Sequence, residues 1–88
     1  MTKTIDKAGF DEWLLRQFEG SHNARRDILS RAQRGSEYID LRIEMSDDEF
    51  KFYLTQSLSG AGLSRSVQSQ VKRAAVLYRQ YLRSTGKL

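Results

Sequence analysis

The chain of 88 residues contains no cysteine and no proline, and only six glycines. The absence of cysteine excludes disulfide bonds and thiolate-ligated zinc sites. Because proline is missing and glycine is sparse, long segments lack helix breakers, which favours an all-α fold over a turn-rich β architecture. The length suits a single domain spanning residues 1–88, and a hydrophobic share of 39% is enough for a modest core.

The sequence also lacks the features of membrane insertion, export and catalysis. No run of about 18 apolar residues could span a bilayer, and the first residues lack the apolar stretch of a signal peptide, so we expect a soluble, cytoplasmic protein with no membrane partner. His22 is the one histidine, and no second histidine or cysteine could share a metal with it. No glycine-rich phosphate loop is present. We therefore predict no enzyme activity, no cofactor and no metal site.

Four segments carry apolar residues at the spacing of one helical face. We predict helices at residues 9–19, 22–34, 47–58 and 64–84, with flexible ends at 1–7 and 86–88. The third helix starts with a capping box, in which Ser46 is the N-cap and Glu49 is at N3, and Ser64 caps the fourth. Gly35 ends the second helix. The expected fold is a compact orthogonal bundle of four helices.

Residues 38–45, "YIDLRIEM", depart from the helical spacing. Here every second side chain is apolar and the others are charged, as in a half-buried strand. A lone strand leaves backbone groups unpaired. This segment is therefore either a strand that pairs with a second copy of the chain or an extended connection between the second and third helices.

The aromatic side chains divide into two groups by their position relative to the apolar stripes. Most lie on a stripe and are predicted to be in the core: Phe10, Trp13, Phe18, Phe50, Tyr53 and Tyr78. Phe52 and Tyr81 lie off the stripes, where each could contact a partner or cover a neighbouring loop.

The charges are sorted along the chain. Residues 36–58 hold six acids and two bases, whereas residues 59–88 hold six bases and no acid. In the last helix four bases recur at spacings of seven, seven and four residues: Arg65, Lys72, Arg79 and Arg83. At 100° per residue they form one ridge beside the core stripe, and Arg26 and Arg34 form a second basic face on the second helix. A basic surface of this kind favours a nucleic-acid partner.

Over residues 8–86 the sequence resembles the core-binding, SAM-like domain of tyrosine recombinases and phage integrases. The resemblance rests on an aromatic helix, "FDEWLLRQF", a basic second helix, "SHNARRDILSRAQRG", and the capped last helix, "GLSRSVQSQVKRAAVLYRQYL". It implies a bacterial or phage-encoded, mobile-element protein that binds double-stranded DNA through its second and fourth helices. The DNA-contacting residues that the resemblance implies are Arg25, Arg26, Arg31, Arg34, Arg65, Lys72, Arg73 and Arg79. The ridge described above adds Arg83. The recombinase catalytic domain is missing, so DNA cleavage is not implied.

Two alternatives remain open. The second half resembles a ribbon-helix-helix repressor, with "YIDLRIEMSDDEF" as strand and helix, which would make the protein an obligate dimer. Its groove-facing side would present Asp40 and Glu44 around Arg42, which is unfavourable next to phosphates. The other alternative is an interaction module whose basic ridge docks on an acidic protein. For the preferred interpretation we expect a monomer or a weak dimer.

Overall fold

The fold consists of helices joined by short loops. The structure, a computed structural model, describes residues 5–17 and 22–88. In this part of the chain it contains the helices α1 (Lys7–Gln17), α2 (His22–Ser36), α3 (Asp47–Gly60) and α4 (Arg65–Ser84). The predicted all-α bundle of four helices is therefore confirmed. Phe18 and the side chain of His22 lie outside what the structure describes.

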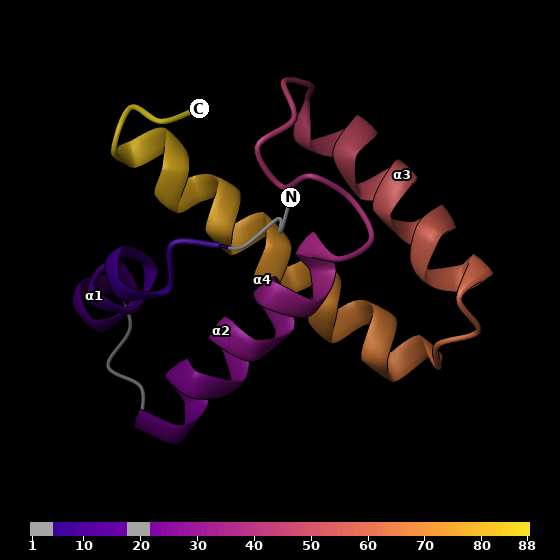
Figure 1. Ribbon diagram of the computed structural model, residues 1–88, viewed down its shortest axis with the longest axis horizontal. Helices are drawn as coiled ribbons and strands as arrows, with labels where there is room; N and C mark the ends of the chain where they lie inside the picture. The colour runs from indigo at the N-terminus through magenta and orange to yellow at the C-terminus, as the bar shows by residue number, and fades with distance from the viewer. Residues whose placement is uncertain (1–4, 18–21) are drawn as a thin grey trace.

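Helix α4 is the central element of the bundle. It contacts each of the other three helices, and Figure 1 shows it crossing behind α2, with α1 on one side and α3 on the other. Small residues let α2 and α4 approach closely, because Ala32 and Gly35 of α2 and Ala74 and Ala75 of α4 are all buried. A Cβ atom at Gly35 would lie 3.2 Å from Val71 Cγ1. Gly35 thus serves packing, and the prediction that it ends α2 is wrong, since the helix continues to Ser36.

The predicted caps of the last two helices are confirmed. The Ser46 hydroxyl accepts a hydrogen bond from the Glu49 N–H at 3.2 Å, and Ser64 accepts from the Val67 N–H at 3.3 Å. These serines satisfy N–H groups that have no partner within the first helical turn. After α3, Gly62 has a φ of 77°, a left-handed conformation that suits glycine and turns the chain towards α4.

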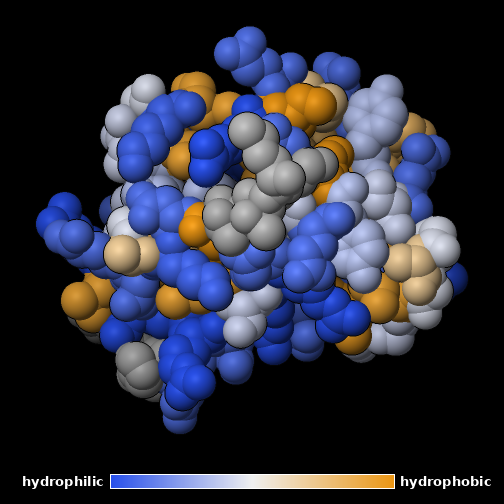
Figure 2. All heavy atoms as spheres, viewed as in Figure 1, coloured by the Kyte–Doolittle hydropathy of each residue, from blue (hydrophilic) through white to orange (hydrophobic). Residues whose placement is uncertain are grey.

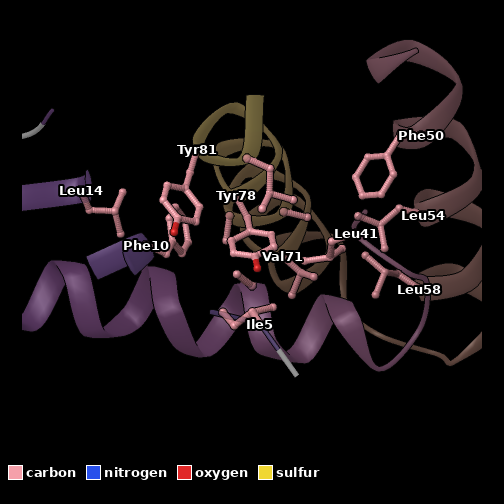
Figure 3. Close-up of a cluster of buried hydrophobic side chains, with 14 residues drawn as sticks. Ile5, Phe10, Leu14, Leu41, Phe50, Leu54, Leu58, Val71, Tyr78 and Tyr81 are labelled. Carbon is pink, nitrogen blue, oxygen red and sulfur yellow. The ribbon is translucent and has the colours of Figure 1, made fainter. Parts of the chain in front are cut away.

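The core has an end rich in aromatic rings and an end rich in leucines, which also holds Phe50, and Figure 3 shows the two on opposite sides of α4. At the aromatic end Phe10 of α1 meets Tyr78 edge to face, with ring centroids 5.1 Å apart. Tyr81 is also buried there, so its placement off the core stripe is wrong. At the other end α3 packs its leucines on α4, while its Tyr53 is 47% exposed and not in the core. Phe52 faces outward as predicted.

The segment before α1 is fastened to the bundle, although a flexible end was expected over residues 1–7. Ile5 is buried, and its N–H donates to Gln33 Oε1 at 3.2 Å. The Asp6 N–H donates to the hydroxyl of Tyr78 at 3.0 Å. Residues 5 and 6 therefore bridge α2 and α4.

The Asp6 carboxylate makes a second connection to α4. The Tyr81 hydroxyl donates to Asp6 Oδ2 at 2.7 Å, and the Gly9 N–H donates to Oδ1 at 3.1 Å. These two hydrogen bonds lower the pKa of Asp6, while burial, together with the bond to Asp6, raises the pKa of Tyr81. Lys87 Nζ, 3.3 Å from Asp6 Oδ2, brings the other end of the chain to the same point.

The connection between α2 and α3 is made of turns. Of the two alternatives for residues 38–45, the strand is therefore wrong, and the segment is a connection between the two helices, folded into turns and not extended throughout. The Tyr38 N–H bonds to the Gly35 carbonyl at 3.0 Å, and the Ile43 N–H bonds to the Asp40 carbonyl at 3.2 Å. No residue of the described ranges is in a strand. Leu41 is nevertheless buried, whereas Arg42 is exposed. The alternating pattern thus predicted the burial of Leu41, but it was wrong for Ile43, which is 36% exposed, and for the backbone conformation.

Candidate nucleic-acid interface

Arg79, predicted to lie on the outward ridge of α4, points into the protein and has no exposed surface. Its guanidinium donates to three carbonyl oxygens of the α2–α3 connection: Leu41 at 3.0 Å, Ile43 at 2.8 Å and Met45 at 2.7 Å. These carbonyls belong to alternate residues, so the guanidinium takes the place that a neighbouring strand would have in a sheet. Three carbonyls of a connection that has no neighbouring strand are satisfied here by one side chain.

The buried charge of Arg79 is compensated at close range. Nε donates to Asp47 Oδ1 at 3.1 Å, and the guanidinium carbon lies 4.5 Å from the centroid of the Phe50 ring. A buried cation needs both a counter-ion and full hydrogen bonding to be tolerated. Arg79 has both, and it holds the start of α3 and the preceding loop against α4.

Arg83, one turn further along α4, is paired with the same carboxylate. Its two terminal nitrogens bind Asp47 in a bidentate pair, Nη1–Oδ2 at 2.6 Å and Nη2–Oδ1 at 2.7 Å. Hydrogen bonds from Arg83 first, and from Arg79, lower the pKa of Asp47 to about 2, and the same pair raises the pKa of Arg83. The predicted ridge is therefore wrong at these two positions: Arg79 is inside and Arg83 is neutralised.

On α2, Arg25 is also engaged within the protein. Its Nε lies 3.1 Å from Asp11 Oδ1 of α1, and its side chain is only 14% exposed. This contact joins the first two helices. Arg25 is therefore not a free cation of the surface.

The remaining six candidates have no ion pair within residues 5–17 and 22–88. They are Arg26, Arg31, Arg34, Arg65, Lys72 and Arg73. Arg31 and Lys72 are half-buried and the other four are exposed. The structure thus separates the sequence-predicted bases into structural cations and free cations.

Two of the free cations from different helices face one groove, which we call the α2–α4 groove. Its volume is about 380 Å³, and Arg31 of α2 and Arg73 of α4 are among the residues that line it. Gln70 adds a hydrogen-bonding amide, and Asp27 contributes the one carboxylate of the lining. The groove therefore holds more donors than acceptors and an excess of positive charge.

A second groove, the α3–α4 groove, has a volume of about 440 Å³ and lies on the other side of Arg73. Its floor is apolar, from Val76 and Leu77, and its basic residues are Lys51, Lys72 and Arg73. The sequence did not indicate Lys51 as a binding residue, because it lies in the acidic segment of the chain. Its helical position, on the side of α3 that faces α4, is the signal that could have found it.

The rest of the surface was compared with three other kinds of site: a hydrophobic interface, a metal site and a membrane span. On the face seen in Figure 2, hydrophilic side chains predominate and hydrophobic ones form separate small areas. Among the described residues, no three histidine, cysteine or acidic side chains are grouped in a way that could hold a metal ion. None of the helices in residues 5–17 and 22–88 is long and apolar enough to cross a membrane.

Comparisons of the chain with protein-family profiles, with curated proteins and with solved structures found no match. What the protein binds is therefore inferred from the geometry and charge of its grooves.

Proposed function

We propose that the protein is a non-catalytic module that binds double-stranded DNA through the α2–α4 groove. The observation that carries the proposal is the convergence of Arg31 and Arg73 on one open groove with neither guanidinium paired to an acid of the described residues. A folded protein ordinarily intersperses acids among such bases. Two guanidinium groups that line one groove without an ion pair in the described part of the chain favour a phosphate backbone as ligand.

The neighbouring residues support a duplex rather than a small anion. Arg34 follows Arg31 by about one turn of α2 and is exposed, and Arg26 is exposed on the same helix. Contacts to several phosphates in succession need cations spread along an element in this way. The resemblance of the sequence to integrase core-binding domains, which bind DNA through the corresponding two helices, supports the same surface. Strand cleavage is not part of the proposal.

The test is the salt dependence of duplex binding. Fluorescence anisotropy with a labelled duplex of about 20 base pairs should give an affinity that falls by about 10²-fold or more between 50 and 200 mM salt, if four or more phosphates are contacted. The double variant Arg31→Ala, Arg73→Ala should bind more weakly at every salt concentration. Its plot of log affinity against log salt should be shallower by about two contacts.

A matched control variant loses the same number of positive charges outside the α2–α4 groove. Lys7→Ala with Arg16→Ala removes two cations from α1, where Arg16 is exposed and paired with Glu12 at 2.6 Å. This control should keep the wild-type salt slope. Salt-independent binding, no detectable binding, or an equal loss in both double variants would contradict the proposal.

Asp27 provides a test in the opposite direction. Its carboxylate lies in the same groove and should repel phosphate, so Asp27→Asn should tighten duplex binding by about two- to fivefold at low salt. The improvement should shrink as salt screens the repulsion. Tighter binding without any salt dependence would point to a contact other than phosphate.

A further inference from the structure

The outer face of α3 carries an exposed aromatic pair beside two acids. Phe52 and Tyr53 are 58% and 47% exposed, and their rings meet edge to face with centroids 5.5 Å apart. Asp48 and Glu49 precede them by four residues, so each carboxylate lies one helical turn before one ring. We call these four residues the acidic-aromatic face. Phe52 and Tyr53 are the large apolar surface of this helix that the bundle does not use.

The α3–α4 groove has the opposite character. Val76 and Leu77 form its apolar floor, and Lys51, Lys72 and Arg73 supply positive charge around it. None of these three cations has an ion pair within the described ranges. Phosphates would account for the cations but not for the apolar floor, because a DNA backbone offers no apolar group to bury there.

We propose that the α3–α4 groove binds the acidic-aromatic face of a second copy of this chain. In such a complex the aromatic rings cover Val76 and Leu77, and the carboxylates approach Lys51 and Lys72. Both the apolar and the electrostatic requirements of the groove are then met by one occupant. Cations next to aromatic rings add a further favourable contact.

A second copy is favoured over an unrelated protein because both complementary surfaces are present on every molecule. They also adjoin each other, since Lys51 of the groove and Phe52 of the face are consecutive residues of α3. Two copies related by a two-fold axis can therefore exchange both contacts at once, which is the commonest form of homodimer. This proposal shares Arg73 with the α2–α4 groove, but its charge partners are Lys51 and Lys72, and it does not depend on DNA binding.

Sedimentation velocity without DNA provides the first measurement. The wild type should pass from monomer to dimer as its concentration rises, and high salt should weaken the dimer because charge pairs contribute to it. Phe52→Ser and the double variant Lys51→Glu, Lys72→Glu should each weaken self-association by about tenfold or more. Circular dichroism should show that Phe52→Ser, at an exposed position, keeps the helical content of the wild type.

Mixing the two variants tests the pairing itself. Phe52→Ser retains an intact groove, and the lysine variant retains an intact acidic-aromatic face. A mixed pair therefore has one complete contact, whereas neither variant alone has any, so an equimolar mixture should associate more strongly than either variant alone. Leu15→Ser is the matched control, because Leu15 is an equally exposed apolar residue on α1. Its self-association should equal that of the wild type.

Three results would overturn the proposal. One is a wild type that stays monomeric up to millimolar concentration. Another is an equal effect of Leu15→Ser, and the third is a mixture of the two variants that associates no more strongly than either variant alone. If duplex binding survives any of these outcomes, the proposed function stands while the dimer does not.

Discussion

The two halves of α4 carry the same residue types for different purposes. The bases of the first half are without an ion pair in the described part of the chain: Arg65, Lys72 and Arg73. Those of the second half, Arg79 and Arg83, bind a single carboxylate at the start of α3. The difference comes from what lies opposite each half. The second half faces the α2–α3 connection and an acidic helix start, whereas the first half lies beside the open grooves.

This contrast shows that a run of bases can serve stability and recognition within one helix. Arg79 satisfies three carbonyls of a connection that has no strand to pair with, and it links that connection to α4. Its removal should affect folding, whereas removal of a free base should affect ligands only. The following predictions test this division, from the largest expected effect to the smallest.

Replacement of Arg79 should be the most damaging single change. Arg79→Ala leaves three buried or half-buried carbonyls without their donor, and we expect a loss of about 3–5 kcal/mol in the free energy of unfolding. Arg79→Lys should also destabilise, by a smaller amount, because one ammonium cannot reproduce the planar fork that contacts all these oxygens. Urea denaturation followed by circular dichroism measures both. Wild-type stability for Arg79→Ala would mean that the guanidinium does not hold the loop.

The aromatic end of the core has its own sensitive position, Gly9 of α1. A Cβ atom there would collide with the Tyr81 hydroxyl and the Asp6 carboxylate, which are hydrogen-bonded to each other. Gly9→Ala should therefore destabilise by about 1–3 kcal/mol. Gly60→Ala is the matched control, because a Cβ at Gly60 meets nothing within 4 Å, and it should be neutral or slightly stabilising. In thermal melts, Gly9→Ala should lower the melting temperature, whereas Gly60→Ala should leave it unchanged or raise it slightly.

Neighbouring acids at the start of α3 should differ in their effect on stability. Asp47→Asn removes the charge that pairs with Arg79 and Arg83, and we expect a loss of about 1–3 kcal/mol. Asp48→Asn removes an exposed acid of the same helical turn, which should cost only about 0.3–1 kcal/mol through the helix dipole. Equal losses in chemical denaturation would mean that the shared pairing adds nothing beyond helix capping.

The pairing of Asp47 also predicts a pH dependence. Its pKa is about 2 in the folded protein, against about 3.9 for an unperturbed aspartate in the unfolded chain. The stabilisation is therefore fully present above about pH 4 and is lost as the pH falls through about 2, since the unfolded state takes up its proton first. Asp6, whose pKa is also lowered, adds a change of the same sign. Stability measured from pH 6 to 2 should fall less steeply in Asp47→Asn than in the wild type.

The smallest effect is expected in the free half of α4. Arg65→Ala removes an exposed cation of the first turn that has no ion pair in the described part of the chain. Its free energy of unfolding should stay within about 0.5 kcal/mol of the wild type. A larger loss of stability, measured in the same urea experiment, would show that the first half of α4 also has a structural role.

The sequence was sufficient to predict the four helices, because their apolar spacing and the caps Ser46 and Ser64 are local signals. The direction of Arg79 was not predictable in this way. On a helical wheel it lies beside the core stripe, at a boundary where the packing of another segment decides burial. The segment that covers it has a strand-like alternation but consists of turns, and it is the Arg79 side chain that satisfies its carbonyls.

The same dependence on three-dimensional packing explains why the environments of Tyr53 and Tyr81, and the place of Lys51 in a groove, were not predicted. Tyr53 and Tyr81 are each found in the environment expected for the other. The edge of α4 near Tyr81 is covered by α1 and Asp6, whereas Tyr53 stays 47% exposed among the described residues. Lys51 is a free cation of the α3–α4 groove although its segment is acidic overall. Which bases are free follows from the positions of acids in space and not from segment charge.

A direct comparison of two charge-matched variants of α4, Arg83→Gln and Arg73→Gln, tests the division most sharply. For each, both the free energy of unfolding and the duplex affinity at low salt should be measured. We predict that Arg83→Gln lowers stability and leaves the affinity of the folded protein unchanged, whereas Arg73→Gln keeps stability and weakens duplex binding. If both variants lose affinity equally, or Arg73→Gln is the less stable of the two, the division of α4 into a structural and a binding half is contradicted.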